Sequence, residues 1–248
     1  MVEFRHVTAG YGGQPILKDL SFSIPKGKIT SLVGPNGCGK TTLLRAAARQ
    51  LPLLKGGIFL ENLPLCQYGR KEFARTAAFL PQMRSVPSIT VERLVSHGRF
   101  PYLGLSRKMR VQDRQAVQKA MESTGVSQWA TRDLTELSGG QRQRVYIAMV
   151  LAQDPDIIFL DEPTTYLDLK HQFELLELLQ NLHAEGKTIV MVLHDLSHAL
   201  RYSHKIVLLE EGRLVADDTP DVLFQKKYLD RVFQVHTHRA EDAYYFTP

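Results

Sequence analysis

The chain has 248 residues, of which 44% are hydrophobic and 23% are charged, a composition that excludes a disordered or fibrous protein. Its length favours one large domain, with or without a smaller inserted lobe, because single hydrophobic cores seldom grow larger. The net charge of +5 permits attraction to phosphates or to an anionic membrane surface but does not by itself indicate nucleic-acid binding.

Two cysteines, Cys38 and Cys66, are too few for a disulfide framework, so we expect a reducing compartment. A bilayer-spanning helix needs roughly 20 apolar residues. The longest purely aliphatic stretches, such as residues 189–193, are far shorter, so no transmembrane segment is expected. The N-terminus lacks a basic region followed by an apolar one, and we therefore expect no secretory signal.

The first fifty residues predict two strands and then a strand, loop and helix. Residues 2–7 and 20–24 alternate apolar and polar side chains beside turn residues, which predicts half-exposed antiparallel strands. A short apolar run at residues 29–33 ends in a glycine-rich turn. Residues 41–50 then have helical composition.

Two later runs, residues 157–160 and 188–193, are also apolar, and each ends abruptly at polar residues. They suit parallel strands buried on both faces, with functional residues at their carboxyl ends. Between these strands and the first ones, residues 83–153 show helical periodicity, which predicts a helical lobe inserted into an α/β core. We expect the core to comprise residues 1–82 and 154–248.

The glycine-rich turn matches the phosphate-binding loop G-x-x-x-x-G-K-[ST], with the required strand before it and helix after it. Its glycines let backbone amides converge on phosphate oxygens, Lys40 can neutralise the β and γ phosphates, and the Thr41 hydroxyl can bind magnesium. A merely structural glycine turn is the alternative, and the flanking elements disfavour it. The expected phosphate-binding residues are Gly34, Pro35, Asn36, Gly37, Cys38, Gly39, Lys40, Thr41 and Thr42.

An acidic pair, Asp161 and Glu162, follows the apolar run at residues 157–160. A phosphate loop needs an acidic partner on a neighbouring strand for its metal, and Asp161 has that position. Glu162 can polarise an attacking water. Alone, such a pair would be read as a helix cap, but beside a phosphate loop the metal and base roles are favoured. The fold class predicted is therefore α/β, a phosphate-loop NTPase core with an N-terminal antiparallel β subdomain and an inserted α-helical subdomain.

Residues 137–144 read LSGGQRQR, which is identical to the signature of ATP-binding cassette (ABC) proteins, and the chain resembles that family over nearly its whole length. The resemblance implies a helix N-terminus that closes on the nucleotide held by a partner subunit. A simple turn with an N-cap is the alternative. The residues concerned are Ser138, Gly139, Gly140 and Gln141.

Four further positions match functional residues of the family. The resemblance implies that Tyr11 stacks on adenine, that Gln82 reaches the magnesium and water, that His194 contacts the γ phosphate and that Asp168 lies in the loop between two sites. A hairpin tyrosine, an exposed loop glutamine and a strand-end histidine are the alternatives, whereas an N-cap role for Asp168 is compatible with its family role. ATP and magnesium are thus the expected cofactors. The implied catalytic set is Lys40, Gln82, Glu162 and His194, and the implied magnesium ligands are Thr41, Gln82 and Asp161.

Two segments resemble the ATPase subunits of bacterial importers for ferric siderophores, ferric citrate, haem and cobalamin. Residues 160–168 read LDEPTTYLD and are followed by Lys170, His171 and Gln172, and residues 98–102 read GRFPY. Of these cargoes, we expect a ferric siderophore or ferric citrate rather than haem or cobalamin.

The resemblance implies several partners and a location. We expect a second copy of the chain, an integral membrane permease and, indirectly, a periplasmic or lipid-anchored binding protein, at the cytoplasmic face of the bacterial inner membrane. The alternative, a soluble cassette ATPase acting on nucleic acid or ribosomes, is disfavoured by the single cassette and its short helical insertion. No nucleic-acid partner is expected.

The permease is expected to dock on residues 82–87 together with Arg99, Phe100 and Tyr102, because apolar anchors ringed by charge are typical of binding hot spots. Residues 84–114 hold seven basic against two acidic side chains, which fits either this surface or an ordinary solvated face.

Three weaker features have ordinary interpretations. His236 and His238 could bind metal but are more typical of an exposed strand. Cys38 could be redox-sensitive but is more simply a filler between two glycines. The last is a leucine stripe that predicts core packing of a helix, formed by Leu175, Leu176, Leu178, Leu179 and Leu182.

Overall fold

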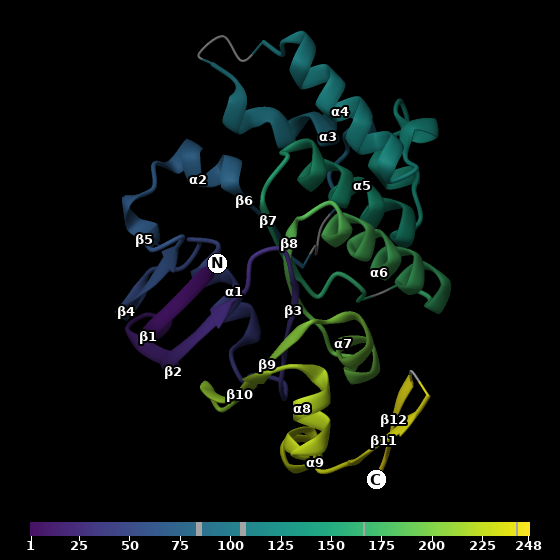
Figure 1. Cartoon of the computed structure of the whole chain (residues 1–248). Coiled ribbons are helices and arrows are strands. Elements are labelled where there is room, and N and C mark those ends of the chain that lie inside the picture. Colours follow the sequence, from purple (N-terminus) through teal and green to yellow (C-terminus); the bar gives the residue numbers. More distant parts are fainter. Residues whose placement is uncertain (83–85, 105–107, 166, 242) are drawn as a thin grey trace.

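A computed structural model describes residues 1–82, 86–104, 108–165, 167–241 and 243–248 (Figure 1). Strands β2 (Gln14–Ile24), β1 (Val2–Tyr11), β4 (Leu53–Leu60) and β5 (Leu63–Pro64) form an antiparallel sheet in that order. A second sheet has the order β10 (Arg213–Asp218), β9 (Lys205–Glu210), β3 (Ile29–Val33), β8 (Thr188–Val192), β7 (Ile157–Asp161), β6 (Ala77–Leu80). A C-terminal hairpin joins β11 (His236–Ala240) to β12 (Ala243–Thr247).

The antiparallel sheet confirms the two strands predicted at the N-terminus. The alternation buries most of the apolar side chains of β1 and β2, and the rings of Phe4 and Phe22 stack at 4.3 Å across the pair. The turn between the strands is made by Gly12 and Gly13, whose φ angles of 57° and 80° are strained for other residues.

The second sheet brings the predicted functional segments together at the carboxyl ends of its central strands. Strands β6, β7, β8, β3 and β9 pair in parallel, and every residue of β3, β7 and β8 is buried, as their apolar sequences predict. Helix α1 (Lys40–Ala47) follows β3 directly after the glycine-rich loop. The carboxyl ends of β3, β7 and β8 therefore lie side by side, with Asp161 opposite Val192.

Helices cover the second sheet and also form the inserted lobe (Figure 1, lobe in teal). The lobe contains α3 (Val91–Ser96), α4 (Val111–Ser123) and α5 (Gly139–Ala152), which agrees with the predicted helical subdomain; its exact limits at residues 83 and 153 remain predictions. The remaining helices are α2 (Arg70–Thr76), α6 (Leu169–Ala184), α7 (Leu196–Tyr202), α8 (Pro220–Gln225) and α9 (Tyr228–Phe233).

The leucine stripe of α6 packs into the core, as predicted. Leu175, Leu176, Leu179 and Leu182 are buried, and Leu178 is partly buried against the same cluster. Among the described residues, we find no helix with the length and apolar character that crossing a membrane requires.

The prediction that Arg99 belongs to the docking surface is wrong. The Arg99 side chain, in a 3₁₀ turn (His97–Tyr102), is buried, and its Nε donates to Asp113 at 3.0 Å. Its Nη1 donates to the Ala152 carbonyl at 2.9 Å, and its guanidinium lies 3.7 Å from the centre of the Tyr102 ring. Arg99 therefore joins the elements of the lobe instead of facing a partner.

Phe100 remains available for docking, because it is 55% exposed. Of the expected docking segment 82–87, residues 83–85 lie outside the described residues.

The pKa of Asp113 is held below its ordinary value. Burial favours the neutral carboxyl group, but hydrogen bonds from the Arg110 backbone and from Arg99 favour the ionised form and outweigh the effect of burial.

Arg99→Leu should lower the free energy of unfolding by about 3 kcal/mol, because it leaves the buried Asp113 carboxylate without its charged partner. Urea denaturation measures the change. Phe100→Ala is the neighbouring control, and its cost should stay near about 0.5 kcal/mol since the side chain is mostly exposed. Equal costs for the two variants would show that the Arg99 ion pair does not organise the lobe.

Candidate nucleotide-binding and hydrolysis site

The loop between β3 and α1 has the backbone that close approach to a phosphate requires. Gly34, Gly37 and Gly39 have φ angles of 149°, 79° and 106°. A Cβ at Gly34 would lie 2.1 Å from the Leu209 carbonyl oxygen, and one at Gly39 would lie 2.7 Å from a Leu17 methyl carbon. Glycine is therefore required at both positions, and no side chain caps the first turn of α1.

Lys40 folds back over this loop. Its Nζ donates to the carbonyl oxygens of Gly34 at 2.7 Å and Pro35 at 3.0 Å, and the side chain is buried. The ammonium group is thus satisfied by the loop itself, and a phosphate would have to replace these carbonyls as its partner.

Cys38 is buried in the same loop, with its Sγ 4.0 Å from the Lys40 Nζ. Burial raises the pKa of the thiol, more than the nearby Lys40 lowers it, so the reactive thiolate is disfavoured. This favours the interpretation of Cys38 as a filler between glycines.

Asp161, the last residue of β7, accepts a hydrogen bond from the Thr41 hydroxyl at 2.9 Å. Burial raises the pKa of this carboxyl group, and the bond from Thr41 partly offsets the effect. The parallel pairing of β3 and β7 with β8 between them brings these two residues together, although 120 positions separate them in sequence.

The Glu162 carboxylate is contacted by side chains from several other segments of the site. Its Oε2 accepts from the Gln82 amide at 2.8 Å and from the Thr165 hydroxyl at 3.2 Å, and its Oε1 lies 2.6 Å from the Nε2 of His194. The Glu162 backbone has a φ of 53°, a conformation that is uncommon for a non-glycine residue and that turns the chain sharply after β7.

The oxygen donors present fit magnesium. A hydroxyl from Thr41, a carboxylate from Asp161 and an amide from Gln82 are hard ligands. Within the part of the chain that the structure describes, no cluster of three or more His, Cys, Asp or Glu residues could hold a metal alone. Magnesium usually uses one or two protein ligands together with phosphate oxygens and water.

Tyr11, at the end of β1, is 45% exposed beside the first helix. Its hydroxyl accepts from Arg45 Nη1 at 3.2 Å, and Arg45 lies on α1. The ring is therefore held at the edge of the phosphate-loop helix with much of its surface open, as stacking on a base requires. No sequence motif pointed to Arg45, or to the contact of Thr165 with Glu162.

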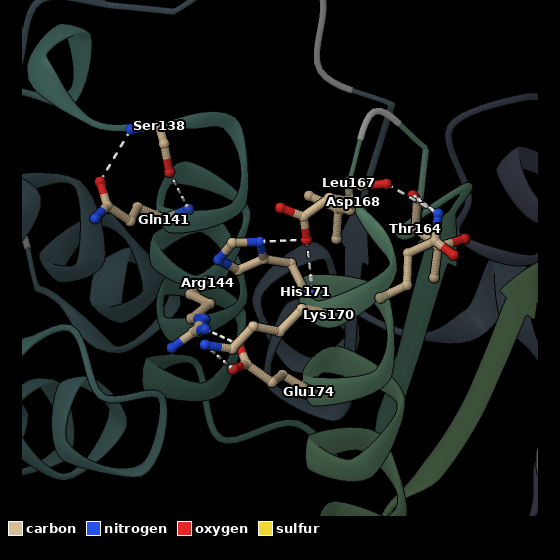
Figure 2. A network of polar contacts seen from close by, with 10 residues as sticks. Ser138, Gln141, Arg144, Thr164, Leu167, Asp168, Lys170, His171 and Glu174 are labelled. Atoms are coloured by element: carbon tan, nitrogen blue, oxygen red, sulfur yellow. Dashed lines mark hydrogen bonds and ion pairs between the residues drawn. The ribbon is translucent and has the colours of Figure 1, made fainter.

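The signature residues form a second group, at the N-terminus of α5 (Figure 2). Ser138 caps the helix: its Oγ accepts from the Gln141 backbone at 3.3 Å, and the Gln141 side chain accepts from the Ser138 backbone at 2.9 Å. Gly139 and Gly140 are the first two helical residues. Asp168 caps the neighbouring α6.

Among the described residues, no hydrogen bond joins this second group to the Lys40 and Glu162 cluster. The structure thus divides the predicted residues into a phosphate-loop half and a signature half. Tyr166, which belongs to the segment that suggested the importer group, lies outside the described residues.

The two C-terminal histidines form part of an exposed hairpin. His238 Nε2 lies 2.9 Å from the Thr247 hydroxyl, and its ring stacks on Tyr245 at 4.9 Å. His236 is an exposed residue of the same strand. These contacts favour the strand interpretation over a metal site.

Comparisons with known proteins place the chain in a family. The family model described as "ABC transporter" matches residues 17–165. The chain is 45% identical to the iron(3+)-hydroxamate import ATP-binding protein of Bacillus subtilis (strain 168), over 94% of this chain and 87% of that protein. It is 42% identical to the ferric enterobactin transport ATP-binding protein of Escherichia coli (strain K12), over 98% of this chain and 91% of that protein.

A comparison with solved structures points to the same family. A dimeric, post-hydrolysis ATP-binding cassette bound to ADP and phosphate superimposes with a TM-score of 0.77 at 28% identity, over 89% of this chain and 99% of that one. The shared fold, the matched family model and the full-length relatives lead to one conclusion: the chain belongs to the ATP-binding proteins of the ABC transporter family.

Proposed function

We propose that this chain is the ATP-hydrolysing subunit of a bacterial importer for a ferric siderophore. The observation that carries the proposal is the cluster formed by the phosphate loop, Asp161 and Glu162, in which Gln82 and His194 both contact the Glu162 carboxylate. The import reaction and the iron-chelate cargo rest on the two relatives named above, each more than 40% identical to this chain over most of its length.

We assign the ATP phosphates to the loop at residues 34–42, with Lys40 exchanging the Gly34 and Pro35 carbonyls for the β and γ phosphates. Tyr11 would stack on the adenine. Thr41, Asp161 and Gln82 would hold magnesium, which supplies charge neutralisation at the phosphates when it is bound.

Glu162 is assigned as the general base. Its Oε2 accepts hydrogen bonds from Gln82 and Thr165, and its Oε1 lies 2.6 Å from the His194 Nε2, so neighbouring side chains surround the carboxylate. Gln82 and His194 are therefore expected to release the carboxylate when nucleotide binds. Glu162 can then accept the proton of the attacking water, and His194 can donate to the γ phosphate.

The signature half is assigned to the nucleotide of a second copy, because within one chain Ser138 and Asp168 do not join the Lys40 cluster. A dimer closed on two ATP molecules completes both sites. We further propose that the dimer binds a membrane permease at the cytoplasmic face of the inner membrane, and that the permease receives cargo from a periplasmic or lipid-anchored binding protein. Phe100 is a candidate contact for the permease.

The cargo is proposed as a ferric siderophore, with ferric citrate next and haem or cobalamin after it. The two relatives carry hydroxamate and enterobactin names respectively, at nearly the same identity to this chain. Identity of the ATPase therefore does not separate one siderophore from another, since cargo contacts belong to other subunits.

Lys40→Ala should weaken ATP binding itself, by about tenfold or more, because it removes the positive charge assigned to the ground-state phosphates. His194→Ala should keep the ATP affinity within about threefold and lower kcat by about a hundredfold, since its bond is assigned to the transferred group. Equilibrium ATP binding and steady-state hydrolysis on the purified chain separate the two effects. Equal losses of affinity in both variants would contradict the assignment.

A strain lacking this chain should lose uptake of a radiolabelled ferric siderophore and regain it with the wild-type chain. Glu162→Gln should not restore uptake, because the amide keeps the shape of the side chain and removes the base. Haem, cobalamin and ferric citrate are supplied in parallel. Loss of cobalamin uptake alone would overturn the iron cargo, and full uptake with Glu162→Gln would overturn the role of Glu162.

A further inference from the structure

The N-termini of α5 and α6 meet through one side chain, that of His171 (Figure 2). The Asp168 Oδ1 accepts from the backbone N–H of His171 at 2.9 Å and lies 2.6 Å from its Nδ1. Because a carboxylate only accepts, Nδ1 is the protonated ring nitrogen. The same two bonds hold the pKa of Asp168 below its ordinary value, so the carboxylate is ionised at neutral pH. The ring is thereby fixed in orientation as well as position.

The carbon edge of the same ring lies against the signature. A Cβ at Gly140 would lie 2.9 Å from both Cδ2 and Cγ of His171 and 3.3 Å from its Cβ. No side chain fits there while the ring keeps its bonds to Asp168. Glycine at position 140 is thus required by this chain's own histidine, in addition to any need for close approach to a nucleotide.

An ion pair further along the two helices supports the same arrangement. Arg144 of α5 pairs with Glu174 of α6, and Lys170 lies 3.9 Å from the same carboxylate. Their side chains are 30%, 36% and 80% exposed, so this pair contributes little by itself. His171 lies closer to the helix N-termini, and 29% of its side chain is exposed.

We infer that His171 is a positioning residue that makes the signature at residues 138–141 and Asp168, the N-cap of α6, move as one unit. The inference rests on the proposed function, in which both parts act on the nucleotide across the dimer interface. Closing the signature on one nucleotide would then also set Asp168 at the interface. His171 would control ATP-driven dimerisation without touching the phosphate loop of its own chain.

The test is the dependence of specific ATPase activity on protein concentration, measured with the full chain and magnesium ATP. His171→Ala removes a hydrogen bond and a packed ring from each of two subunits. If each change weakens dimerisation by about threefold, the two together raise the protein concentration needed for half-maximal activity by about tenfold. The ATP affinity of the dilute chain should stay within about twofold, because the phosphate loop is unchanged.

Two conservative variants divide the contact. His171→Asn keeps a donor for Asp168 but leaves the space beside Gly140 empty. His171→Phe keeps a ring beside Gly140 but loses the donor. For each variant, the protein concentration at half-maximal activity should lie between those of wild type and His171→Ala. His6→Ala is the matched control, because His6 pairs with Asp19 at 2.8 Å on the exposed antiparallel sheet. That variant should follow the wild-type curve.

The outcomes are distinguishable. A wild-type chain that neither binds nor hydrolyses ATP would overturn the proposed function and this inference together. An active wild type whose midpoint is unchanged in His171→Ala would overturn the inference alone. Should His171→Ala fail to fold, the Asn and Phe variants decide, and wild-type midpoints in both would overturn the inference.

Discussion

The site depends on the parallel register of three buried strands. Pairing of β7 with β8 places Asp161 opposite Val192, so Glu162 and His194 leave the sheet close to each other. β3 pairs with the other side of β8 and sends the phosphate loop to the same edge. A shift of one residue in β7 would turn Asp161 to the opposite face and separate it from Thr41. Complete burial of these strands makes that register hard to change.

Within this frame, Glu162 joins the separate segments of the site. The amide of Gln82 comes from the start of the lobe and the imidazole of His194 from the end of β8, and both bind one carboxylate. Because Gln82 directly precedes the inserted lobe in sequence, we expect movement of the lobe to change the Gln82 contact with Glu162. This linkage gives the proposed importer a route by which a partner bound to the lobe can influence hydrolysis. His171 provides the corresponding link between the signature and Asp168.

Local patterns predicted much of this arrangement. The apolar runs became β3, β7 and β8 with nearly the expected limits. The helix expected at residues 41–50 is α1 at Lys40–Ala47, so Lys40 opens the helix instead of ending the loop, and Ser138 lies at the expected helix N-terminus. Arg99 was misjudged because a basic residue beside aromatic ones resembles a docking surface, while its partner Asp113 lies on another helix. Arg45 and Thr165 were missed because their contacts arise from tertiary packing, which short patterns do not encode.

The central claim is that Glu162 exchanges its partners when nucleotide binds, and the most direct measurement of it is the resonance of the His194 Nε2 nitrogen. Protein with isotopically labelled histidine gives this signal, and the resonance that disappears in His194→Asn is assigned to His194. The account predicts a His194 Nε2 resonance in the nucleotide-free chain that moves in Glu162→Gln and also moves when wild type binds magnesium and a non-hydrolysable ATP analogue. A resonance that stays the same in all three samples would contradict the account.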